Sequence, residues 1–160
     1  MFKRIVMRGL KTGAVLSLTS TAAVMLAGLW ETGSPWAGVN AISHIVDGDD
    51  ISQPSEFSPR ESSIGLAVNA AAMLGWAVLY EGALALAGKK SNPLTAAAAS
   101  AAAYIVDYKI VPPRLRPGME KKLSRDAIFA AYAVLAATLA LSPLWNDYDE
   151  NPSAETSTGR

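Results

Sequence analysis

Four long apolar stretches, separated by shorter polar segments, dominate the pattern of the chain. They cover residues 13–30, 63–88, 93–111 and 127–145. A helix needs roughly 20 predominantly apolar residues to cross the hydrocarbon core of a bilayer. The first, second and fourth stretches meet that length, whereas the third is rich in alanine and ends in the charged residues Asp107 and Lys109. The pattern predicts an all-α, membrane-embedded bundle of four helices, of which the third either crosses the bilayer or is re-entrant.

Composition narrows the class of protein further. The 160 residues are 51% hydrophobic, include no cysteine and carry no net formal charge. The lack of cysteine excludes disulfides and thiolate metal sites, and the balanced charge gives no reason to expect a nucleic-acid partner. We expect a single helical membrane domain over residues 1–145 without a cofactor. Residues 146–160 are polar, acidic and aperiodic, which is typical of a disordered tail.

A basic segment precedes the first apolar stretch and allows two interpretations. Such a segment followed by an apolar region occurs in cleaved signal peptides and also at the start of an uncleaved membrane helix. The apolar stretch here is longer than the usual hydrophobic region of a signal peptide, and no A-x-A cleavage site follows it. We therefore expect an uncleaved first helix.

The basic residues also bear on orientation and on the number of crossings. Lysine and arginine concentrate on the cytoplasmic side of membrane proteins. With the N-terminus in the cytoplasm, four crossings would place seven basic residues on each side. Three crossings would place twelve in the cytoplasm and two outside. The charge count favours three crossings and helix length allows four, so the third crossing stays open.

A shorter helix is predicted between the first two stretches, over residues 35–47. Ser34 and Pro35 are a typical helix start, and Gly48 is a typical stop. At about 13 residues the helix is too short to cross a bilayer. Three polar side chains share one face of it, at positions Asn40, His44 and Asp47. The pattern indicates an amphipathic interfacial helix, lying on the membrane surface or tucked into the mouth of the bundle.

This polar face is the first candidate for a catalytic or metal-binding site. An aspartate three residues after a histidine can orient the imidazole as a general base, and histidine with carboxylates can bind a metal. However, His44 is the single histidine of the chain, and no nucleophile or phosphate-binding motif accompanies it. We interpret Asn40, His44 and Asp47 mainly as a structural face, with ligand or lipid contact and catalysis as alternatives, and we expect no metal.

The second apolar stretch carries two polar residues at membrane depth, Asn69 and Glu81. An ionisable group inside a membrane is a functional hypothesis by default, because its charge must be paired or neutralised. In the structural alternative, such residues form hydrogen bonds between helices, and Gly75 and Gly82 allow close helix approach. A proton or ion role for Glu81 stays open beside that alternative.

The segment between the third and fourth stretches is basic. Its candidate contacts to anionic lipid headgroups are Arg114, Arg116, Lys121 and Lys122. A solvated connector is the alternative, because basic residues beside membrane helices are common. If the third stretch crosses the membrane, this segment emerges on the same side as Asp47 and the acidic residues after it. We then expect the acidic end of the short helix to dock onto the basic segment.

Two short motifs carry a resemblance to a known group of proteins. The first consists of Pro35-Trp36-Ala37, Asn40-Ala41 and Ser43-His44, and the second of Asp107-Tyr108, Pro112, Arg114-Leu115, Pro117-Gly118 and Glu120. In these motifs the chain resembles uncharacterised small multi-pass inner-membrane proteins of Gram-negative bacteria. It departs from their pattern after His44, where we would expect an aromatic residue. The resemblance covers most of the chain and implies architecture and location, but no activity.

Three functional hypotheses follow from the sequence. The leading one is a non-catalytic accessory, assembly or lipid-contacting subunit of the bacterial inner membrane, with its N-terminus in the cytoplasm. Its partners would be the lipid bilayer, anionic lipids or another membrane protein. The first alternative is a small transporter or channel element that uses Asn69 and Glu81. The second is a membrane enzyme that uses His44 and Asp47.

Overall fold

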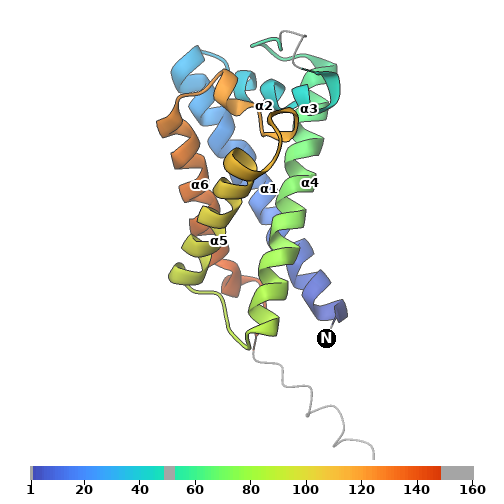
Figure 1. Cartoon of the computed structure of the whole chain (residues 1–160), viewed down its shortest axis with the longest axis vertical. Helices are drawn as coiled ribbons and strands as arrows, with labels where there is room; N and C mark the ends of the chain where they lie inside the picture. Colours follow the sequence, from blue (N-terminus) through green and yellow to red (C-terminus); the bar gives the residue numbers. More distant parts are fainter. Residues whose placement is uncertain (1, 49–52, 149–160) are drawn as a thin grey trace, which may run out of the picture.

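The computed structural model describes residues 2–48 and 53–148, and all regular secondary structure in this part of the chain is helical (Figure 1). The long helices are α1 (Phe2–Thr32), α4 (Pro59–Leu86) and α6 (Arg125–Ala140), beside the shorter α5 (Pro93–Ile105). Within the described residues, three helical segments are long and apolar enough to cross a membrane: Phe2–Thr32, Pro59–Leu86 and Arg125–Leu144. The all-helical fold and the apolar character of these three helices are confirmed.

Helix α1 is the centre of the bundle. It packs against both α4 and α6, and α5 packs against α6. Helices α4 and α5 are less closely packed and meet through side chains, with the hydroxyl of Tyr80 3.1 Å from that of Thr95. Figure 1 shows α1 and α5 running towards one end of the bundle, and α4 and α6 running back from it. The third apolar stretch thus runs along the bundle, as α5 and the π-helical turn η1 (Val106–Ile110).

The close approach of α1 and α4 depends on glycines of α1. A Cβ atom at Gly9 or Gly13 would lie 2.8 Å from the Cα of an α4 residue, so a larger residue would push the helices apart. The expectation that Gly75 provides such a contact is wrong, because a Cβ there would meet nothing within 4 Å. At Gly82 the nearest atom would be 3.8 Å away, which is ordinary packing. Gly75 points away from the face of α4 on which Ala77 is fully buried.

One end of the bundle is closed by two short helices and a coiled segment, which we call the cap. It comprises α2 (Trp36–Ile42), α3 (His44–Asp47), η2 (Pro113–Leu115) and η3 (Met119–Lys121). A cluster of buried apolar side chains joins it to the long helices, and its members are Val24, Val39, Ile42, Met119, Leu123 and Ile128. The cap is therefore part of the hydrophobic core.

The helix predicted over residues 35–47 is present but interrupted. The interruption is at Ser43, whose amide donates to the carbonyl of Asn40, three residues earlier, at 3.0 Å. Helix α2 ends there and α3 begins. Gly48 ends α3 with φ at 99°, a conformation that glycine adopts readily. The helix lies in the mouth of the bundle, because all of α2 after Trp36 is buried.

Candidate functional site

Asn40 holds the loop before α4 against the cap. Its side-chain amide donates to the carbonyl oxygens of Pro54 at 2.9 Å and Glu56 at 2.7 Å. Its Oδ1 accepts from the hydroxyl of Ser62 at 2.7 Å, which ties α2 to the first turn of α4. All three contacts are internal and Asn40 is fully buried. Asn40 therefore has a structural part in the cap, with no face left for a ligand.

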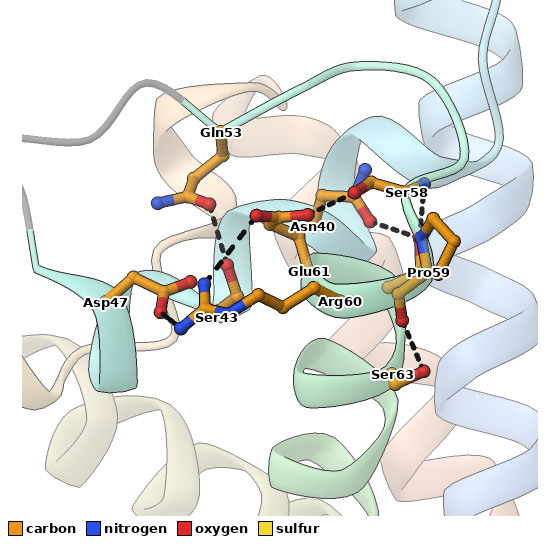
Figure 2. A network of polar contacts seen from close by, with 10 residues as sticks. Asn40, Ser43, Asp47, Gln53, Ser58, Pro59, Arg60, Glu61 and Ser63 are labelled. Atoms are coloured by element: carbon orange, nitrogen blue, oxygen red, sulfur yellow. Dashed lines mark hydrogen bonds and ion pairs between the residues drawn. The ribbon is translucent and has the colours of Figure 1, made fainter.

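Asp47 pairs with the start of α4. Its Oδ1 lies 2.6 Å from the guanidinium of Arg60, and Figure 2 shows the arginine reaching back from α4 to meet it. The basic segment does reach this end of the short helix, because Arg114 donates to the carbonyl oxygens of His44 and Val46, but the ion pair of the Asp47 carboxylate is with Arg60. The acidic residues after it, at positions 49 and 50, lie outside the described residues.

The pairing of Asp47 with Arg60 predicts a pH effect. The hydrogen bond from Arg60 holds the pKa of the Asp47 carboxyl below its ordinary value of 3.8. A pKa lowered by folding stabilises the folded state above the ordinary value, and that stabilisation is lost as pH falls through the folded pKa. We expect Arg60→Gln to raise the pKa of Asp47 towards 3.8, as measured by NMR titration of the carboxyl carbon. The variant Lys89→Gln should leave that pKa unchanged, and an equal pKa in parent and Arg60→Gln would contradict the pairing.

His44 links the two halves of the cap. Its Nε2 lies 2.8 Å from the carbonyl oxygen of Arg116. Because a carbonyl can accept but not donate, Nε2 must carry the proton, and Nδ1 then accepts from the ammonium of Lys121 at 3.3 Å. Both ring nitrogens are thus engaged with the basic segment and not with Asp47. Asn40, His44 and Asp47 face three different partners, so the structure does not bring them together as one constellation.

The basic segment wraps around α3. The guanidinium of Arg114 donates to the carbonyl oxygens of His44 and Val46 and so caps the C-terminal end of α3. The ammonium of Lys122 donates to the hydroxyl of Ser55 at 3.3 Å. Arg114, Arg116 and Lys122 form no ion pair within the described part of the chain. Among the described residues, their positive charge is therefore held at the capped end without a salt bridge to a carboxylate.

Glu81 lies fully buried near the opposite end of the bundle. Its carboxylate accepts hydrogen bonds from Thr12 at 3.1 Å and from the side-chain amide of Asn146 at 3.1 Å. The hydroxyl of Tyr148 lies 2.9 Å from both carboxylate oxygens. Arg8 lies above the ring of Tyr148, 4.8 Å from its centroid. These contacts tie α1, α4 and the segment after α6 together, as expected of a polar group that organises helix packing.

Two residues of the predicted tail belong to this cluster. Asn146 is buried and Tyr148 is half-buried, so the bundle extends past the boundary that the sequence suggests at residue 145. Burial, followed by the charge of Glu81, raises the pKa of Tyr148 to about 12, so its hydroxyl keeps its proton and remains a donor. Residues 149–160 lie outside the described part of the chain.

Asn69 and Asp107 line a cavity beneath the cap. The amide nitrogen of Asn69 donates to the hydroxyls of Ser20 at 2.9 Å and Thr21 at 3.0 Å. The cavity holds about 110 Å³ and lies among α1, α4, η1 and α6. Its apolar lining includes Val24, Ile42, Met73, Met119 and Leu135. Asn69 thus forms hydrogen bonds between α4 and α1, as its structural interpretation predicts.

Asp107 is the residue that sequence reasoning missed. Its carboxylate accepts a hydrogen bond from the hydroxyl of Tyr132 at 2.6 Å and lies in the π-helical turn η1. Such turns are frequent at functional sites. In the sequence analysis, Asp107 was interpreted only as a charge at the end of the third apolar stretch. The signal that could have found it is an acidic residue within helical reach of an apolar stretch, the same signal that singled out Glu81.

The search for a metal site and the comparisons with known proteins do not point to a known activity. Among residues 2–48 and 53–148, no three His, Asp or Glu side chains are grouped to hold a metal ion. Searches against family models, curated proteins and solved structures find no match. The functional argument therefore rests on the geometry of the cap and of the cavity beneath it.

Proposed function

We propose that this chain is a non-catalytic accessory protein of the bacterial inner membrane whose cap contacts anionic lipid headgroups. The observation that carries the proposal is the basic segment, which is held around α3 by specific contacts. Arg114 and Lys121 are exposed, and Arg116 and Lys122 are half-exposed. Each basic group near an anionic membrane surface contributes about 1 kcal/mol of attraction, so four in one place form an effective contact.

The internal contacts of the polar candidates support a non-catalytic role. Catalytic groups must reach a substrate, and general bases need a free acceptor atom. The polar atoms of Asn40 and Glu81 instead form hydrogen bonds with neighbouring helices and loops. Both ring nitrogens of His44 contact the basic segment. Their roles in this proposal are to fix the cap and the opposite end of the bundle.

We further propose four crossings, with α5 and η1 as the third of them and the N-terminus in the cytoplasm. The 13 residues of α5 and five residues of η1 together reach roughly 25 Å, close to the thickness of a hydrocarbon core. Contacts at its two ends support this path. The hydroxyl of Tyr80 lies 3.1 Å from that of Thr95 at one end, and the segment after η1 reaches His44 in the cap at the other.

The lipid contact is tested with the full chain purified in a neutral detergent. We expect added phosphatidylglycerol to raise the thermal unfolding temperature, whereas phosphatidylcholine should not. The double variant Arg116→Gln with Lys122→Gln removes two charges of the cap, and we expect it to lose most of the effect of phosphatidylglycerol. The carbonyl of Arg116 that binds His44 is unaffected by this change.

A matched control removes the same charge from the other end of the bundle. The double variant Lys89→Gln with Lys90→Gln should keep the stabilisation by phosphatidylglycerol. An equal loss in both double variants would mean that only total charge matters. That result, or the absence of any difference between the two lipids in the parent, would overturn the proposed lipid contact at the cap.

A further inference from the structure

The carboxyl group of Asp107 lines the cavity beneath the cap and has no positive partner among residues 2–48 and 53–148. Asp107 accepts a hydrogen bond from the hydroxyl of Tyr132 at 2.6 Å. No basic side chain of the described residues forms an ion pair with it. A charge in an apolar enclosure is costly unless it is paired, so this arrangement is suited to a cation from outside the chain.

A second unused acceptor lines the same cavity. The hydroxyl of Ser20 donates to the carbonyl of Ser17, so it must accept from the nitrogen of Asn69. That fixes the orientation of the amide, and its Oδ1 makes no hydrogen bond within the described part of the chain. The cavity therefore offers acceptors from two walls, the Asp107 carboxylate on η1 and the Asn69 oxygen on α4. A ligand that fits them must carry hydrogen-bond donors.

From this geometry we propose that the cavity binds a small organic ammonium ion. The carboxylate of Asp107 serves as its counter-ion, the oxygen of Asn69 accepts one of its N–H groups, and the ring of Tyr132 offers an aromatic surface to the cation. A bare metal ion fits less well, because Mg²⁺ and Ca²⁺ require six or more oxygen ligands and most of this lining is apolar carbon.

The volume of the cavity limits the size of the ligand. It holds about 110 Å³, whereas an engineered apolar cavity of about 150 Å³ accommodates benzene. A primary ammonium with a short alkyl chain of about four carbons matches that space. A second hollow of about 220 Å³ lies between α4 and α5, on the other side of Leu135, which lines both spaces.

The proposal is tested by direct binding to the purified full chain. n-Butylammonium chloride is the probe, butan-1-ol is its uncharged counterpart, and sodium chloride controls for ionic strength. We expect a saturable rise of the thermal unfolding temperature with n-butylammonium alone. In Asp107→Asn the apparent affinity should fall at least tenfold, whereas Asp126→Asn, which removes an exposed aspartate at the start of α6, should bind as the parent does.

A second variant keeps the test decisive if Asp107→Asn fails to fold. Ala131 lines the cavity, so Ala131→Leu should fill it, remove binding and leave Asp107 in place. The proposal is overturned if the parent shows no saturable effect of n-butylammonium. It is equally overturned if butan-1-ol has the same effect, or if Asp107→Asn or Ala131→Leu binds as well as the parent. None of these outcomes depends on lipid binding at the cap.

Discussion

Glu81→Lys is expected to abolish the folded bundle, while Glu81→Gln leaves it nearly intact. The carboxylate is fully buried and faces three donors, the side chains of Thr12, Asn146 and Tyr148. A lysine would place a cation among donors, with Arg8 above the ring of Tyr148 as a further positive charge nearby. An unpaired buried charge of this kind costs about 4 kcal/mol, a large part of the stability of a small domain.

The variant Glu81→Gln removes the charge of this side chain and keeps its shape. It keeps one oxygen as an acceptor at the Oε1 position, where three of the four hydrogen bonds converge. We expect a loss of about 1 kcal/mol, the usual net value of one hydrogen bond. Thermal unfolding in detergent and membrane accumulation are the measurements, with Glu56→Lys in an exposed loop as the control for charge reversal. Accumulation of Glu81→Lys equal to the parent would show that this carboxyl is not enclosed.

Gly118→Ala is expected to detach the basic segment from the cap. Gly118 has φ at 81°, and an added Cβ would overlap a ring carbon of His44 and lie 2.6 Å from the carbonyl oxygen of Ala41. Neither group can move freely, because one is backbone and the other is a buried ring. Overpacking of this kind costs 1–3 kcal/mol, and the left-handed backbone adds about 1 kcal/mol, so we expect a loss of about 3 kcal/mol.

Gly88→Ala is the matched control for this prediction. Its φ of 62° carries a similar backbone penalty, but a Cβ there would meet nothing within 4 Å. We expect a loss of about 1 kcal/mol in thermal unfolding, so the difference between the two variants reports the contact with His44. Equal losses at Gly118 and Gly88 would mean that His44 and the basic segment do not pack together.

The helical fold was predictable because it follows from local patterns. The apolar stretches fix α1, α4 and α6, and Ser124, a residue type common at helix starts, caps α6 with its hydroxyl accepting from the amide of Ala127 at 3.1 Å. Gly48 ends α3 for the same local reason, since glycine adopts a positive φ at little cost. Properties that depend on a few neighbouring residues can be read from one sequence.

The candidate site was less predictable because its contacts join distant parts of the chain. A shared helix face suggested that Asn40, His44 and Asp47 act together, but the partners lie in the loop before α4, in the basic segment and at Arg60. Periodicity describes the face of a helix and not what packs on it. Asp107 was overlooked for the same reason, since Tyr132 meets it across helices.

Cysteine labelling across the cap tests most directly the claim that the two loops meet on one side of the membrane. The ammonium of Lys122 lies 3.3 Å from the hydroxyl of Ser55, and the chain has no cysteine of its own. The account predicts that Ser55→Cys and Lys122→Cys react with an impermeant thiol reagent from the same side, that Lys90→Cys reacts from the opposite side, and that a short bifunctional reagent crosslinks the double variant. Labelling of Ser55→Cys and Lys122→Cys from opposite sides would contradict it.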